Sequence, residues 1–129
     1  MIVAVVDASA LLALLLGEPG GDKVSAILDR SAVCTVNWSE IVAYYARDGA
    51  SEQEIRQLID PLPVERVPFD EPLSYIAGLL IPATRAAGLS FGDRACLALA
   101  RQLGVKAMTT DRPWSRIAHT AGVEVELIR

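Results

Sequence analysis

Four acidic residues stand where predicted strands meet predicted helices: Asp7, Glu40, Asp93 and Asp111. The first and the last directly follow short apolar runs, Ile2–Val6 and Ala107–Thr110, which predict strands. The other two each lie in the first turn of a predicted helix. In an open α/β sheet, the ends of the strands and the starts of the following helices share one edge, and ligands bind at that edge. The pattern therefore predicts that the four carboxylates gather at one place.

Carboxylates that gather in this way repel one another. Two like charges about 4 Å apart, at an effective dielectric constant of about 20, cost about 4 kcal/mol. A helix N-terminus offsets only about 0.3–1 kcal/mol of that repulsion. Either one of the acids holds a proton or a divalent cation lies between them. A hard cation held by oxygen ligands commonly serves chemistry on phosphate, so the pattern indicates a metal site of that kind.

Each acid also has a structural interpretation. Asp7 and Asp111 are suitable helix N-caps, and the segments Asn37–Glu40 and Ser90–Asp93 resemble capping boxes. For any one acid taken alone, capping is the favoured role. The metal-site hypothesis depends on the coincidence that all four acids fall on one rim of one sheet, whereas the remaining acids of the chain show no such arrangement.

The surrounding sequence predicts alternating strands and helices. Strands are expected at Ile2–Val6, Val33–Val36, Val64–Val67, Ala107–Thr110 and Val123–Ile128. Helices are expected at Ala8–Leu16, at Asp22–Arg30, from the Asn37 capping box to Arg47, at Ser51–Ile59, at Glu71–Ala87 with a break at Pro82, at Arg94–Leu103 and from Arg112 to about Thr120. This alternation predicts an α/β fold with a parallel sheet that helices cover on both faces.

Length and composition bound the class of protein. With 129 residues, the chain is expected to form a single domain covering residues 1–129. Apolar residues make up 52% of it, which indicates either a surface covered by a partner or a second copy, or simply an Ala- and Leu-rich composition. A net charge of −4 argues against broad electrostatic binding of nucleic acid, but not against a nucleic-acid enzyme whose metal ions supply positive charge.

Cysteine and histidine usage argues against a zinc site. Cys34 and Cys96 are far apart in the sequence, and His119 is the only histidine. Both cysteines stand in apolar surroundings and are expected to be buried, reduced core residues of a cytoplasmic protein. The apolar start Met1–Leu16 lacks basic residues, and its run Ala8–Leu16 is too short to span a bilayer, so a soluble protein without membrane association is expected.

Four segments of the chain resemble the PIN domain, specifically the VapC-type toxin ribonucleases of bacterial toxin–antitoxin pairs: VVDAS at Val5–Ser9, NWSEI at Asn37–Ile41, LSFGDRACLALA at Leu89–Ala100 and TTDRPW at Thr109–Trp114. The resemblance implies a PIN-like three-layer α/β/α sandwich with a parallel sheet of four to five strands. It implies a Mg²⁺- or Mn²⁺-dependent endoribonuclease that cuts structured RNA, such as tRNA or rRNA. It also implies a cognate antitoxin that blocks the site, and a homodimer within a larger complex with that antitoxin.

For such an enzyme, the four acids would form the catalytic and metal-binding set. We expect Asp7 and Asp93 to bind the ion directly, and Glu40 and Asp111 to act through bound waters. An activated water would attack the phosphorus in line. The resemblance implies products with 5′-phosphate and 3′-hydroxyl ends.

Neighbouring polar residues are candidates for supporting roles. Ser9 and Thr110 stand beside two of the acids and are candidates for orienting a ligand or a water, with local capping as the alternative. Arg94, Arg112 and Arg116 closely follow acids and are candidates for RNA contact, with ordinary surface or ion-pair roles as the alternative.

The charge of the site suggests how an antitoxin would silence it. An acidic pocket favours a basic side chain from the partner, an arginine, in place of the metal. A partner-binding groove is predicted between the helices Ser39–Arg47 and Ser51–Ile59. Its lining on the first helix would be apolar and aromatic: Ile41, Val42, Tyr44 and Tyr45.

Two other interpretations stay open. One is another metal-dependent, phosphate-handling α/β enzyme, such as a receiver domain or a haloacid-dehalogenase-like phosphatase. The phosphatase pattern requires a second aspartate where this chain has Ser9, and the receiver pattern requires an acid pair at Asp7 and a lysine after a late strand, whereas Lys106 precedes its strand. The other is a non-catalytic PIN-like binding module that keeps the acids as caps, and it predicts no metal dependence.

Overall fold

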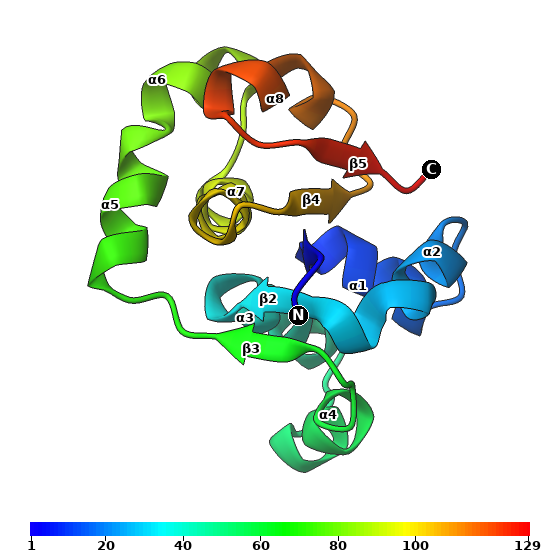
Figure 1. Ribbon diagram of the computed structural model, residues 1–129. Helices are drawn as coiled ribbons and strands as arrows, with labels where there is room; N and C mark the ends of the chain where they lie inside the picture. The colour runs from blue at the N-terminus through cyan, green and yellow to red at the C-terminus, as the bar shows by residue number, and fades with distance from the viewer.

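A five-stranded sheet forms the centre of the molecule (Figure 1). The computed structural model describes residues 1–129, and its strands are β1 (Ala4–Val6), β2 (Ser31–Cys34), β3 (Glu65–Val67), β4 (Lys106–Thr109) and β5 (Val125–Leu127). All neighbouring strands are parallel, in the order β3-β2-β1-β4-β5. The predicted parallel sheet is confirmed, and β1 lies in its middle with β4 beside it.

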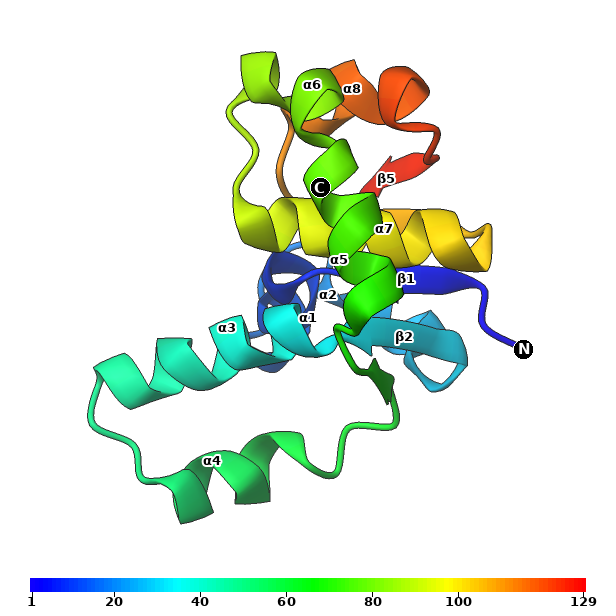
Figure 2. The ribbon, with the colours of Figure 1, turned by 90° about the vertical axis from the view of Figure 1, so that its left-hand side faces the viewer.

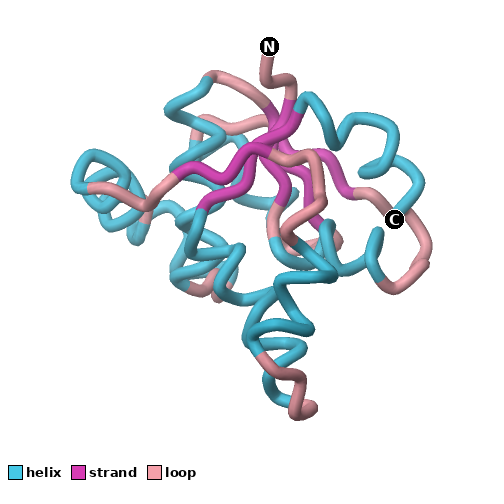
Figure 3. The backbone as a smooth tube through the Cα atoms, turned by 90° about the horizontal axis from the view of Figure 1, so that it is seen from below, coloured by secondary structure: helices cyan, strands magenta, loops and turns pink.

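Helices connect the strands and surround the sheet, as the view from below shows (Figure 3). They are α1 (Ala8–Leu15), α2 (Gly21–Ile27), α3 (Thr35–Arg47), α4 (Glu52–Ile59), α5 (Glu71–Leu79), α6 (Ile81–Thr84), α7 (Phe91–Leu103) and α8 (Trp114–Ala121), with 3₁₀ turns η1 (Leu28–Arg30) and η2 (Arg85–Ala87). Figure 1 shows α7 end-on between α5 and the sheet. None of the helices has the length and apolarity needed to cross a bilayer.

Successive residues of β1 serve two separate cores. Val5 faces a core built mainly with α5, α7 and α8, whereas Ala4 and Val6 face a second core built with α1 to α4. A strand covered on both faces needs apolar side chains in both directions, which explains its continuous apolar sequence. The resulting three layers confirm the expected α/β/α sandwich. Cys34 and Cys96 are free thiols buried in the first core, as predicted.

The start of α3 differs from the sequence prediction. Strand β2 covers Ser31–Cys34 instead of Val33–Val36, and α3 begins directly after it at Thr35. The Thr35 hydroxyl accepts a hydrogen bond from the N–H of Phe69 at 3.0 Å, which ties the start of the helix to the loop after β3. The capping box predicted from Asn37 is therefore wrong, because Asn37 lies inside the first turn of α3 and is buried.

The predicted break at Pro82 is confirmed. Helix α5 ends at Leu79, and the short α6 begins at Ile81, so that Pro82 falls in the first turn of a new helix, where its missing N–H is harmless. The new direction brings α6 and η2 against α8. On the other side of the molecule, α3 and α4 form an antiparallel pair that extends beyond the sheet (Figure 2).

Candidate active site

The pairing of β1 with β4 fixes the first two groups of the site. Their register places Val6 beside Met108, so that Asp7 and Thr109, the next residues along the two strands, lie side by side. Asp111 follows two residues later. Helix α1 starts directly after β1 at this edge. The N-terminus of α7 lies near it, because the charge of Asp93, in the first turn of α7, acts on Asp7.

Asp7 is a buried carboxylate, with 5% of its surface exposed. Its Oδ1 accepts hydrogen bonds from the Ala10 N–H (2.8 Å) and the Ser9 hydroxyl (2.7 Å), and its Oδ2 accepts from the Thr109 hydroxyl (2.6 Å). Burial is the main cause that raises the pKa of Asp7 to about 6, with a smaller contribution from the charge of Asp93, and the three hydrogen bonds act in the opposite direction. At neutral pH this carboxylate is ionised at an energetic cost that a cation would reduce.

Thr109, rather than Thr110, is the threonine that contacts Asp7. Its buried hydroxyl donates to Asp7 and accepts from the N–H of Asp111 at 3.0 Å. Thr110 contributes only its backbone, whose N–H donates to the Ser9 hydroxyl at 3.0 Å. Successive side chains along a strand point in opposite directions, so only one of the two threonines can face Asp7. Ser9 contacts Asp7 as expected, Thr109 is a contact that the sequence analysis did not single out, and the supporting role of Thr110 beside Asp111 stays a prediction.

Asp93 forms the capping box predicted at the start of α7. The Ser90 N–H donates to Asp93 Oδ2 at 2.8 Å, and the Ser90 hydroxyl accepts from the Asp93 N–H at 3.2 Å. Partial burial raises the pKa of Asp93 above its ordinary value, and the negative charge of Asp111 raises it further, although the Ser90 hydrogen bonds lower it. Asp93 thus lies within the electrostatic field of both Asp7 and Asp111.

Asp111 does not cap a helix. Helix α8 begins after Pro113 without a side-chain cap, and the half-buried Asp111 side chain makes no hydrogen bond within the protein. Its backbone carbonyl accepts from the Trp114 N–H at 3.2 Å instead. The structural interpretation thus holds for Asp7 and Asp93 and is wrong for Asp111, whose carboxylate stays available to a ligand.

Glu40 lies one turn beyond Asn37 on α3 and reaches the start of α7. Its Oε1 accepts a hydrogen bond from Asn37 Nδ2 at 2.9 Å. Its carboxylate lies so close to Gly92 that a Cβ added there would stand 2.8 Å from Glu40 Cδ. Glu40 therefore sits against the residue that precedes Asp93, and all four predicted acids lie around one end of α7.

The four acids do not form a complete cage for a metal ion in this structure. No group of three His, Cys, Asp or Glu side chains is close enough together to hold one. Asp7, Asp93 and Glu40 each accept a hydrogen bond from a different partner within the protein: Thr109, Ser90 and Asn37. The donor set nevertheless fits Mg²⁺ or Mn²⁺ in its chemistry, because these hard ions prefer carboxylate oxygens.

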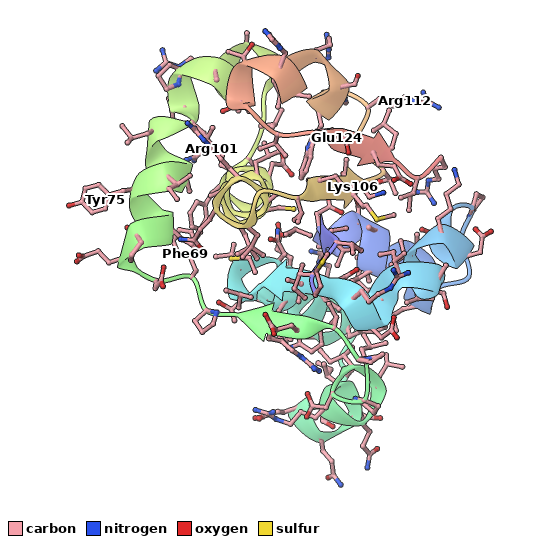
Figure 4. The ribbon with its side chains drawn as sticks, viewed as in Figure 1. Phe69, Tyr75, Arg101, Lys106, Arg112 and Glu124 are labelled. Carbon is pink, nitrogen blue, oxygen red and sulfur yellow. The ribbon has the colours of Figure 1, made fainter.

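The three candidate arginines differ in their surroundings. Arg94 turns toward α5, where its Nη1 donates to the Ala77 carbonyl at 3.1 Å and its guanidinium carbon lies 5.8 Å from the Phe91 ring centre. Arg112 and Arg116 are exposed and form no salt bridge. Figure 4 shows Arg112 extending outward from the loop after β4. These two remain the candidates for substrate contact.

A first prediction concerns Gly92. The change Gly92→Ala should push the Glu40 carboxylate away from Asp93, because the added methyl group would occupy its position. The φ angle of Gly92 is not positive, so the effect would come from space and not from backbone strain. We expect Mn²⁺ affinity, measured by calorimetry, to fall by about tenfold. The control is Gly78→Ala in α5, where an added Cβ meets nothing within 4 Å. Equal Mn²⁺ affinity in both variants would contradict the placement of Glu40.

Comparison with known proteins identifies the family. The sequence model of the PIN domain matches residues 4–120. The fold is similar to a DNA-bound VapBC from Salmonella typhimurium (14% identity, TM-score 0.78, 100% of both chains covered) and a toxin–antitoxin complex from Klebsiella pneumoniae (18% identity, TM-score 0.73, 98% of both chains). It is also similar to VapBC-5 from Mycobacterium tuberculosis (20% identity, TM-score 0.66, 98% of this chain and 99% of that one). No curated protein matches in sequence. The family match extends over most of the chain, and the protein therefore belongs to the PIN domain family.

Proposed function

We propose that this PIN domain is a VapC-type toxin, a Mg²⁺- or Mn²⁺-dependent endoribonuclease that a cognate antitoxin holds inactive. The observation that carries the proposal is the placement of Asp7: a buried carboxylate, held by Ser9 and Thr109 at the carboxyl edge of a parallel sheet and close enough to Asp93 to be affected by its charge. Support for the toxin assignment comes from two of the similar structures, one described as a toxin–antitoxin complex and one as a member of the VapBC family of toxin–antitoxin systems. We propose structured RNA, tRNA or rRNA, as the substrate.

Each acid has a distinct role in this proposal. Asp7 and Asp93 would hold the ion directly, and Glu40 and Asp111 would orient waters beside it. When bound, a divalent ion would neutralise these carboxylates and activate a water for in-line attack on phosphorus, leaving 5′-phosphate and 3′-hydroxyl ends. Thr109 fixes the orientation of Asp7 and, through the Asp111 N–H, the position of the loop after β4. Such supporting hydrogen bonds keep a ligand in the geometry that binding requires.

The test is cleavage of purified tRNA and rRNA with Mn²⁺, with EDTA, and with Asp7→Asn in place of wild type. We expect cleavage with 5′-phosphate ends in the first case only. A protein that binds RNA without cutting it and without Mn²⁺ dependence would instead be a binding module. An aspartyl-phosphate analogue formed with beryllofluoride would indicate a receiver-like or phosphatase-like enzyme.

The charge distribution supports a basic surface along which the RNA substrate would lie, called the substrate path below. Between Pro72 and Val123 the chain carries six Arg and Lys residues, and its only acids there are Asp93 and Asp111. Three of these basic residues are exposed: Arg85 on η2, Arg116 on α8, which packs against η2, and Arg112 in the loop before α8. None of them forms a salt bridge. In a protein of net charge −4, we propose this surface as the one that contacts phosphates beside the acids.

The double change Arg112→Ala with Arg116→Ala tests this path. Because each arginine would contact one phosphate, we expect KM for RNA to rise by about fivefold to tenfold, and the salt dependence of binding to lose about two units of slope. Mn²⁺ affinity should stay unchanged, since neither residue is a ligand. Arg101→Ala, an exposed arginine near the other end of α7, is the control. An equal rise in KM for the control variant would count against a localised path.

A groove between α3 and α4 is the proposed docking place for the antitoxin. It has a volume of about 380 Å³, and its walls are mainly apolar: Trp38, Val42, Ala46, Ala50, Ile55 and Ile59. Its polar lining includes Glu52 and Asp60, and both pair with Arg56. Of the residues predicted to line it, Tyr44 and Tyr45 pack edge-to-face on one another and do not line it, and Ile41 is buried in the core. An apolar floor with acids at its border suits an amphipathic, basic segment.

An antitoxin arginine is expected to replace the metal at the acids. If that arginine and a divalent ion compete for the same carboxylates, the toxin–antitoxin complex should weaken as the Mn²⁺ concentration rises. The measurement is the dissociation constant of the complex at several Mn²⁺ concentrations. The control is the complex of the Asp93→Asn toxin, whose dissociation constant should not depend on the Mn²⁺ concentration. A constant affinity in wild type would contradict the competition.

A further inference from the structure

Asn37 connects the two helices that carry half of the acid set. It lies in the first turn of α3 and is 1% exposed. Its Nδ2 donates to Glu40 Oε1 at 2.9 Å and to the backbone carbonyl of Gly92, in α7, at 3.0 Å. These two acceptors determine the orientation of the amide, because exchanging its nitrogen and oxygen would place Oδ1 against both of them.

The oxygen of the same amide indicates that Asn37 does not serve mainly to stabilise the core. Its Oδ1 is buried and has no hydrogen-bond partner. An unpaired buried acceptor lowers stability, and an apolar side chain of similar volume would avoid that cost. Glu40, being exposed, could pair with water instead. A buried amide that lowers stability in this way indicates a role at the site that it contacts.

Glu40 needs such a restraint to remain at the site. It is a long, exposed side chain that makes no salt bridge and no hydrogen bond other than the one from Asn37. Without that bond, side-chain entropy would favour rotamers directed into solvent. On its opposite side, Gly92 leaves the space that the carboxylate occupies. The Glu40 carboxylate thus lies between the Asn37 amide and the α-carbon of Gly92, the residue before Asp93.

We propose that Asn37 is a positioning residue, which holds the Glu40 carboxylate beside Asp93 so that it can orient water at a bound divalent ion. The inference rests on the proposed function, because it assigns Asn37 to the same metal site. It adds a residue that does not bind the ion itself and acts only through Glu40.

A double-mutant cycle on Mn²⁺ binding tests the proposal. Calorimetry is performed on wild type, Asn37→Ala, Glu40→Gln and the double variant. We expect Asn37→Ala and Glu40→Gln each to lower Mn²⁺ affinity by about tenfold, as loss of an outer contact does. The double variant should bind no more weakly than Glu40→Gln, because Asn37 has no further effect once the Glu40 charge is gone. Asn37→Leu, of similar volume, replaces Asn37→Ala if the smaller side chain leaves an unstable protein.

Two further measurements separate positioning from stability. Thr84→Ala removes a different buried polar group, a hydroxyl that donates to the Leu80 carbonyl, and should lower the melting temperature without changing Mn²⁺ affinity. In the metal-free protein, the Asn37 side-chain amide NMR signals should shift in Glu40→Ala, which reports the hydrogen bond without any activity.

The outcomes are distinguishable. Additive effects of Asn37→Ala and Glu40→Gln, or a folded Asn37→Ala protein with wild-type Mn²⁺ affinity, would overturn the role of Asn37 alone. An unshifted Asn37 amide signal in Glu40→Ala would do the same. Wild-type protein that neither binds Mn²⁺ nor cuts RNA would overturn the proposed function, and the positioning role with it.

Discussion

Asp93→Asn is expected to abolish RNA cleavage in a protein that still folds. The variant keeps the capping box, because the asparagine oxygen can still accept from the Ser90 N–H, but it loses the charge that would bind the ion directly. Loss of an outer contact to a metal typically costs about 10–100-fold, so loss of a direct ligand should lower kcat by more than about 100-fold. The measurement is cleavage of a fixed RNA at saturating Mn²⁺, with the melting temperature recorded in EDTA.

The matched control is Asp29→Asn, which makes the same chemical change at an exposed acid that forms no salt bridge. It should cleave at the wild-type rate. In EDTA, the Asp93→Asn protein should melt at the wild-type temperature or above it, because loss of the Asp93 charge relieves its repulsion with Asp7 and Asp111. Wild-type cleavage by a folded Asp93→Asn protein would rule out the ligand role.

Asp7→Asn is expected to stabilise the metal-free protein in a pH-dependent way. The pKa of Asp7 is about 6 in the folded protein, against an ordinary value of 3.8. The folded state therefore holds the proton more tightly, so wild-type stability decreases as pH rises from about 4 through about 6. A difference of about two pH units corresponds to about 3 kcal/mol. Between pH 4 and pH 7, the free energy of unfolding should shift by about this amount in favour of the variant.

Urea unfolding in EDTA at several pH values measures this shift. The asparagine amide can donate to Thr109 or Ser9, whose hydroxyls can reverse their direction, so the variant should keep its fold. Asp29→Asn should show no pH-dependent difference from wild type. A gap between Asp7→Asn and wild type that stays constant with pH would contradict the raised pKa. In wild type, Mn²⁺ affinity should decline below about pH 6, because the ion then has to displace the proton that Asp7 takes up.

Local sequence patterns predicted the parts of the site that local contacts build. The Ser90–Asp93 capping box is complete within four residues, and the structure contains it. The same pattern at Asn37 misled, because the hydrogen-bond partner of Asn37 across the fold is Gly92, 55 positions away in the chain. No pattern of single residues reveals that contact. The helix start at Thr35 was missed for the same reason, since its hydroxyl pairs with the loop at Phe69.

The identity of the threonine beside Asp7 depends on how β1 and β4 align. If the predicted strands Ile2–Val6 and Ala107–Thr110 are placed side by side with their last residues at the same height, side chains alternate between the two faces of the sheet. Only one of the two threonines can then face Asp7. The observed register, Val6 beside Met108, selects Thr109. Strand order and register depend on how the whole sheet packs, which is why the fold class could be predicted but this contact could not.

The measurement that tests the central claim most directly is calorimetric titration of Mn²⁺ into wild type, Asp7→Asn and Asp29→Asn at pH 7.5. The account predicts saturable binding to wild type and to Asp29→Asn, and binding weakened by more than about 100-fold in Asp7→Asn. Absence of saturable binding in wild type, or equal affinity in all three proteins, would contradict the claim that these carboxylates together hold a divalent ion.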